Sequence, residues 1–189
     1  MKHLLLIPTM LMSAASATET RIPKSSEARV PESVVDGADN FYRSDKVAVQ
    51  KVTFRNQYKM KVAGNLFIPK ASDQNGKWPA IVVGHPMGAV KEQSANLYAQ
   101  KLAERGFVTL SLDLSFWGES EGEPRNAVLP DVYAEDFSAA VDFLGTRPFV
   151  DRYRIGVLGI CGSGSFVISA AKIDKMPSAS SRAASSSIR

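Results

Sequence analysis

The chain has 189 residues, a formal net charge of +4 and 44% hydrophobic residues. This length suits a single domain with a hydrophobic core of its own. The basic residues are scattered along the sequence, and no nucleic-acid-binding motif accompanies them, so we expect no nucleic-acid partner.

The first 17 residues have the pattern of a secretory signal peptide. Lys2 supplies a basic start, and residues 4–12 form an apolar run that is too short to cross a bilayer. Ala15-Ser16-Ala17 is a cleavage signal of the Ala-x-Ala type. We therefore expect cleavage after Ala17 and a secreted or periplasmic protein that has no membrane contact after signal removal. The alternative is an N-terminal membrane anchor.

The next segments predict an arm followed by a hairpin. Residues 18–45 are polar and interrupted by prolines, which indicates a loosely ordered arm. Residues 46–54 and 60–68 carry the apolar pattern of extended strands, and the turn residues 56–58 lie between them. We expect these two strands to pair antiparallel.

Short apolar runs then alternate with helical patterns. Buried strands are predicted at 79–84, 107–112 and 155–160, and helices at 94–105 and 132–144. This alternation predicts an α/β fold with a mostly parallel sheet and helices on both faces. The loops that follow the three strands should meet at the carboxyl edge of the sheet, where such folds bind ligands.

The last of these strands breaks over glycines into a helix, which is the arrangement of a nucleophile elbow, Gly-x-Ser-x-Gly. In the frame of residues 159–163, Cys161 occupies the nucleophile position. A shifted frame puts Ser163 there. We prefer Cys161 because it directly follows the strand, whereas Ser163 would lie in the first helical turn. Cys161 is the only cysteine, so it forms no disulfide within the chain, and the alternative is a buried structural thiol.

Four segments together resemble the α/β-hydrolase superfamily, close to its dienelactone-hydrolase-like group. They are the hairpin, the segment Gly84-His85-Pro86-Met87-Gly88 at the position of the His-Gly oxyanion loop, residues 113–122 resembling Asp-x-x-Gly-x-Gly-x-Ser, and the elbow with its cysteine. The resemblance covers residues 46–174. It implies a hydrolase, of esterase or dienelactone-hydrolase type, that cleaves an ester, lactone or similar acyl bond through a Cys161 acyl-enzyme.

The same resemblance implies an oxyanion hole made by two backbone amides, those of Gly162 and Met87, because Pro86 has no N–H. His85, Phe116 and Trp117 are expected at the substrate, although a histidine in this loop is usually structural. The partner is a small-molecule acyl substrate. No cofactor is implied, and no metal-ligand cluster is visible in the sequence.

The resemblance fails after the elbow. The family places its catalytic acid and histidine after the nucleophile, but the 28 residues beyond Cys161 contain no histidine, and residues 175–189 are a low-complexity tail without Asp or Glu. We interpret the chain as C-terminally truncated, with activity impaired and the later strands missing. The alternatives are a non-catalytic fragment or small-molecule-binding module of the same fold, a partner chain that completes the site, and chemistry that uses His85 as a substitute base.

Two further expectations concern acidic residues and the sheet edge. Asp113 precedes the nucleophile and is predicted to cap the loop that follows it, and Asp136 is predicted to pair from a helix with a neighbouring loop or solvent. Without later strands, the edge of strand 155–160 would be exposed, which favours self-association.

Overall fold

The computed structural model describes residues 42–70 and 76–173. The predicted signal peptide, most of the predicted arm and the low-complexity tail lie outside these residues, so secretion stays a prediction. None of the helices within the described ranges has the length and apolar character needed to cross a membrane.

The hairpin predicted from the sequence is confirmed. Strand β1 (Val47–Arg55) pairs antiparallel with β2 (Lys61–Pro69), in a register that places the first residue of β1 opposite the last of β2. The turn between them is closed by Asn56, whose N–H donates to the Met60 carbonyl and whose side-chain oxygen accepts from the Met60 N–H.

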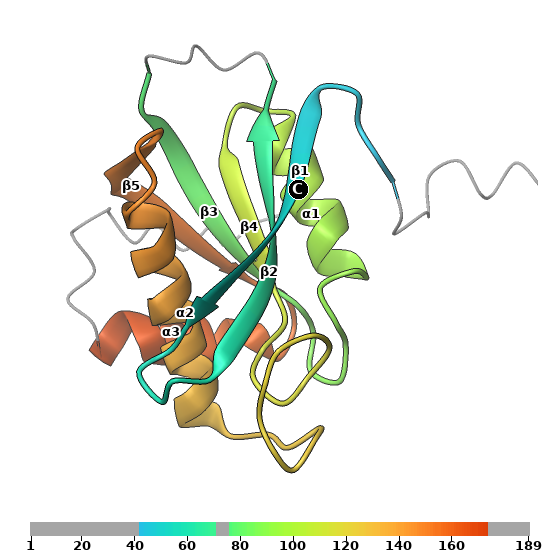
Figure 1. The fold of residues 1–189 in the computed structure, drawn as a ribbon, viewed down its shortest axis with the longest axis vertical. Coiled ribbons are helices and arrows are strands. Elements are labelled where there is room, and N and C mark those ends of the chain that lie inside the picture. Colours follow the sequence, from blue (N-terminus) through green and yellow to red (C-terminus); the bar gives the residue numbers. More distant parts are fainter. Residues whose placement is uncertain (1–41, 71–75, 174–189) are drawn as a thin grey trace, which may run out of the picture. The chain divides into compact units, whose positions relative to one another are not determined.

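Three further strands complete a five-stranded sheet of order β1-β2-β4-β3-β5. They are β3 (Trp78–Gly84), β4 (Val108–Leu112) and β5 (Val150–Gly159). Strand β3 runs parallel to both β4 and β5, whereas β2 joins β4 antiparallel. The sheet is therefore mixed: its β4-β3-β5 half is parallel, as predicted, and the hairpin adds two antiparallel pairings (Figure 1).

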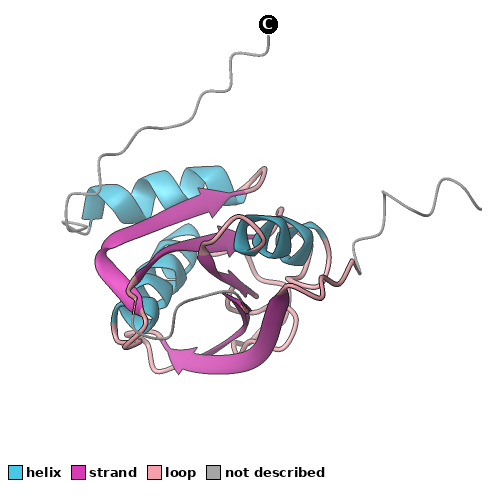
Figure 2. Ribbon diagram, turned by 90° about the horizontal axis from the view of Figure 1, so that it is seen from above, coloured by secondary structure: helices cyan, strands magenta, loops and turns pink. Residues whose placement is uncertain are grey.

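Helices cover both faces of this sheet (Figure 2). Helix α1 (Ser94–Ala103) packs on one face through its buried alanines, against Phe67 and Val83. Helices α2 (Pro130–Gly145) and α3 (Ser163–Ile173) pack on the other face. The buried stripe of α2 follows helical spacing and consists of Tyr133, Phe137, Ala140 and Leu144.

The alternation of side chains along the central strands explains why both faces are covered. In β3, Ala80 and Val82 contribute to the α2/α3 core, while Val83 contributes to the α1 core. In β4 the face toward α1 carries polar residues that are satisfied there: Thr109 Oγ1 donates to the Ala99 carbonyl, 2.7 Å away. A strand that is buried on both faces appears in the sequence as a continuous apolar run, and this pattern predicted the central strands β3 and β4.

Strand β5 forms one edge of the described sheet, where it pairs with β3 alone. Large apolar side chains near this edge are exposed, notably Tyr153 on β5 at 68% and Ile168 on α3 at 59%. The exposed edge predicted from the sequence is thus present in the described part of the chain. Self-association through it stays a prediction.

Candidate active site

The elbow at the end of β5 presents Cys161 to solvent. Cys161 lies two residues after the strand and two before α3, its thiol is free and exposed, and its φ is +55°. A non-glycine residue in this left-handed region costs on the order of 1–3 kcal/mol and persists only where the surroundings hold it. A strained residue on a sharp strand-to-helix turn is the geometry of a nucleophile elbow.

Two glycines allow this turn to be so tight. A Cβ at Gly159 would lie 2.5 Å from backbone atoms of Ser163 and Gly164, so only glycine lets the first turn of α3 approach the strand. A Cβ at Gly162 would lie 3.0 Å from the Met87 Cβ. The elbow and the loop after β3 are therefore in direct contact.

Ser163, the alternative nucleophile, is placed differently. It is the first residue of α3, its side chain is fully buried, and its hydroxyl donates to the His85 carbonyl. A hydroxyl that is buried and already bonded has no path to a substrate. The geometry therefore favours Cys161 over Ser163 as the nucleophile. The hydrogen bond of Ser163 joins α3 to the loop after β3.

The two amides predicted for the oxyanion hole lie beside each other. The Met87 nitrogen is 3.5 Å from where a Cβ of Gly162 would be. Within residues 42–70 and 76–173, neither amide donates a hydrogen bond to another atom of the chain. Free, adjacent N–H groups next to an exposed thiol could stabilise an oxygen that becomes negatively charged during acyl transfer.

His85 is not available to a substrate, which corrects the sequence-based expectation. The residue is 1% exposed. Its Nε2 accepts the Leu114 N–H at 3.1 Å, so Nδ1 carries the proton and donates to the Pro86 carbonyl at 2.7 Å. Burial lowers the pKa of the ring. Both nitrogens are thus used inside the protein, and His85 can serve neither as a substrate-binding group nor as a substitute base.

Phe116 also differs from the expectation. The residue is 4% exposed and belongs to the hydrophobic core, because Gly122, at φ +127°, brings the loop backbone directly over the Phe116 ring. Trp117 is partly buried, and its indole N–H is shared between the Ala127 carbonyl, at 3.1 Å, and the Tyr133 hydroxyl, at 2.6 Å. Contact between Trp117 and substrate stays a prediction.

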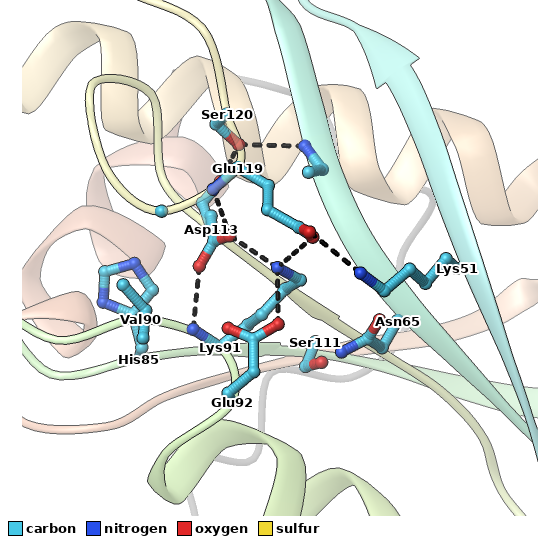
Figure 3. A network of polar contacts seen from close by, with 12 residues as sticks. Lys51, Asn65, His85, Val90, Lys91, Glu92, Ser111, Asp113, Glu119 and Ser120 are labelled. Carbon is cyan, nitrogen blue, oxygen red and sulfur yellow. Dashed lines mark hydrogen bonds and ion pairs between the residues drawn. The ribbon is translucent and has the colours of Figure 1, made fainter.

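Asp113 caps its loop as predicted (Figure 3). Its buried carboxylate accepts the Glu119 N–H at 2.9 Å, which closes the loop that follows β4. It also accepts two hydrogen bonds from Lys91, one from the backbone N–H at 2.8 Å and one from Nζ at 2.7 Å. The carboxylate is therefore fully used in joining two loops.

Lys91 was missed by the sequence analysis. Its side chain is fully buried, and Nζ lies 2.7 Å from Glu92, 2.7 Å from Asp113 and 2.8 Å from Glu119. Burial alone favours the neutral amine, but the hydrogen bonds that Lys91 donates to these carboxylates outweigh it and raise the pKa of Lys91. Hydrogen bonds from Lys51 and Lys91 lower the pKa of Glu119 to about 2. Nothing in the sequence around Lys91 distinguishes it from a solvated surface lysine.

Asp136 pairs with a neighbouring loop, as expected. From α2 it accepts the Ser115 N–H at 2.7 Å, the Ser115 hydroxyl at 2.9 Å and the Asn56 amide at 2.9 Å. Burial raises the pKa of Asp136 to about 6, although these donors oppose the shift. Asp136 thus joins α2 to the hairpin turn and to the loop after β4.

We expect Asp136 to make the protein less stable as the pH rises from about 4 to about 6.5. The Asp136 carboxyl group keeps its proton in the folded state at pH values where the unfolded chain, with the ordinary pKa of 3.8, has lost it. The resulting contribution to the free energy of unfolding is therefore complete below pH 3.8 and is lost as the pH rises to about 6. The loss is on the order of 2–3 kcal/mol. Urea unfolding of wild type and Asp136→Asn at several pH values measures it. The variant should lack this part of the slope, and Asp142→Asn, at an exposed position of α2, should keep it; equal slopes would contradict the assignment.

A cluster that could hold a metal ion, with three or more His, Cys, Asp or Glu side chains together, is absent from the described residues.

Comparisons with known proteins show which proteins this chain is similar to. The model of the dienelactone hydrolase family matches residues 62–182. The uncharacterized protein PA2218 of Pseudomonas aeruginosa is 55% identical over 135 residues, which are 71% of this chain and 36% of that protein. Its crystal structure superposes with a TM-score of 0.70 at 54% identity, covering 72% of this chain and 42% of that one.

Two further relatives extend the comparison. The uncharacterized protein YcjY of Escherichia coli K12 is 43% identical over 127 residues, 66% of this chain and 42% of the relative. The thiohydrolase aneE of Aspergillus aculeatus is 36% identical over 132 residues, 70% of this chain and 40% of the relative. The chain thus spans between 36% and 42% of the length of these three relatives.

Proposed function

The chain belongs to the dienelactone hydrolase family, a family of hydrolases with the α/β-hydrolase fold, and from this premise we propose that it attacks ester, lactone or thioester bonds through Cys161. The observation that carries the proposal is the elbow itself: an exposed thiol, held at φ +55°, beside the free amides of Met87 and Gly162. The name of the thiohydrolase relative supports including thioesters among the acyl bonds.

The proposed step is acyl transfer to sulfur. The Cys161 thiolate attacks the carbonyl carbon, a C–S bond forms, and the electron pair of the C=O bond moves onto oxygen. The Met87 and Gly162 amides donate to that oxyanion, and each such donor typically contributes about 10²–10³ in rate. When the oxyanion collapses, the C–O or C–S bond of the substrate breaks, the alkoxide or thiolate leaves and takes a proton from water, and a thioester remains on Cys161.

Release of the acyl group needs a base to activate water. His85 is the single histidine within the described residues, and both of its ring nitrogens are bonded inside the protein. We therefore expect this chain to be acylated about once and to release the acyl group slowly. The second candidate function is a small-molecule-binding module without catalysis. It is supported by the same observation, that both ring nitrogens of His85 are already bonded.

The test is a reaction with p-nitrophenyl acetate. Wild type should release about one equivalent of p-nitrophenolate per chain, with mass spectrometry finding the acetyl group on Cys161, and hydrolysis of the thioester should follow slowly. Cys161→Ala should give no such burst. Cys161→Ser matches the side-chain volume but lacks the thiol, and should react at least about 10²-fold more slowly because a hydroxyl ionises far less readily. A burst that survives Cys161→Ala, or no acylation of wild type, would refute the proposal, and the second result would favour the binding module.

A further inference from the structure

The loop between β3 and α1, residues 85–93, is held at both ends by two consecutive residues that follow β4. We call it the Met87 loop. At its start, His85 Nε2 accepts the Leu114 N–H at 3.1 Å. At its far end, the Lys91 N–H donates to Asp113 at 2.8 Å. Met87 therefore lies between two anchor points on one short segment of the chain.

The far anchor is an ion cluster rather than a single hydrogen bond (Figure 3). The three carboxylates around Lys91 Nζ come from three places: Glu92 from the Met87 loop itself, Asp113 from the start of the loop after β4, and Glu119 from farther along that loop. On the outside, Lys51 of β1 contacts Glu119 at 2.8 Å. Because a buried charge that loses its partner is strongly disfavoured, the cluster holds the Met87 loop and the loop after β4 together.

The Met87 side chain does little to hold its own backbone in place. It is 52% exposed, and the turn around it is closed by one hydrogen bond, from the Ala89 N–H to the Pro86 carbonyl at 3.1 Å. The orientation of the Met87 N–H therefore depends on the two anchors. The anchor at His85 is reinforced by Ser163, and the anchor at the other end depends on Lys91.

We propose that Lys91 is a positioning residue, which keeps the Met87 N–H directed toward the acyl oxygen bound at Cys161. This inference rests on the proposed function and adds to it a residue that touches neither substrate nor sulfur. Without the ammonium group, the Glu92 carboxylate on the Met87 loop faces those of Asp113 and Glu119 on the loop after β4 with no cation between them. Their repulsion separates the two loops, and the Met87 amide loses its fixed direction. A misplacement of about 1 Å in a reacting group costs on the order of 10² in rate.

The experiment compares Lys91→Met, which keeps the length of the side chain without its charge, with the conservative Lys91→Arg. Lys101→Met is the matched control, because Lys101 pairs with Glu104 on the exposed side of α1. If Lys91→Met gives little folded protein, Glu119→Gln weakens the same cluster from its half-exposed side. Two readouts apply to each variant, and each is compared with wild type.

The first readout is the ¹⁵N order parameter of the Met87 amide, which does not require catalysis. We expect about 0.85 in wild type and Lys101→Met, and less than about 0.6 in Lys91→Met, while amides of β3 and β4 stay rigid. The second is the ratio of the rate constants for acylation by p-nitrophenyl acetate and alkylation by iodoacetamide at Cys161. Alkylation displaces iodide and forms no oxyanion, so the ratio isolates the amide donors.

We expect the ratio to fall about 10- to 100-fold in Lys91→Met, about 10-fold or less in Lys91→Arg, and not at all in Lys101→Met. A folded Lys91→Met protein with a rigid Met87 amide and an unchanged ratio would overturn the inference and leave the proposed function intact. If wild type is not acylated at all, the proposed function fails, and the order parameter alone decides whether Lys91 positions Met87.

Discussion

Replacing Met87 by proline is expected to slow acylation of Cys161 by about 100- to 1000-fold while leaving the fold intact. The hydrogen bond from the Ala89 N–H to the Pro86 carbonyl, together with φ +76° at Gly88, defines a type II turn with Met87 at its second position. Proline is favoured at that position. The substitution therefore preserves the turn and removes one N–H, and the loss of one oxyanion donor has this magnitude.

The matched variant is Met87→Ala, which shortens the half-exposed side chain and keeps the amide. It should be acylated by p-nitrophenyl acetate within about threefold of wild type, because the amide is the group that contributes. Iodoacetamide should alkylate Cys161 equally fast in all three proteins. Thermal unfolding of Met87→Pro should be unchanged or slightly raised in Tm, since proline restricts the unfolded chain. If the acylation rate of Met87→Pro equals that of Met87→Ala, the Met87 amide is not an oxyanion donor.

The architecture was predictable from the sequence where the signal was local. The hairpin, the three central strands and the helices after them all follow from apolar periodicity and from turn residues. The antiparallel pairing of β2 with β4 was not predictable, because it joins segments about 45 residues apart, with β3 and α1 between them. Strand β5 begins at Val150, five residues before the predicted start, because Val150 pairs with Trp78 across an irregular register.

The candidate site, too, could be predicted from the sequence only where the signal was local. The elbow and the Met87 amide follow from local rules: glycines at a strand-to-helix turn, and a proline that has no N–H to offer. The placements of His85 and Phe116 depend on residues that follow β4. The Leu114 N–H donates to a ring nitrogen of His85, and the backbone at Gly122 covers the ring of Phe116. Lys91 became visible only when the fold brought Asp113 and Glu119 to it. In a polar loop, a buried ion cluster and a solvated surface have the same sequence pattern.

The second large effect concerns the sharpness of the elbow. Gly159→Ala is expected to destabilise the protein by about 1–3 kcal/mol and to slow acylation of Cys161 by about 100-fold. The added methyl group would lie 2.5 Å from the backbone of Ser163 and Gly164, which are rigid parts of α3, so the helix must move away from β5. Cys161 would then lose its position relative to the Met87 and Gly162 amides.

Gly156→Ala provides the control for this prediction, because it places the same methyl group on the same strand without a clash. The nearest atom to that Cβ would be the Ala80 carbonyl oxygen, 4.0 Å away. Urea unfolding should therefore give Gly156→Ala a stability within about 1 kcal/mol of wild type, and its burst with p-nitrophenyl acetate should be unchanged. If Gly159→Ala matched Gly156→Ala in both measurements, close contact between α3 and β5 would not be what positions the Cys161 thiol, and the elbow would lose its mechanical basis.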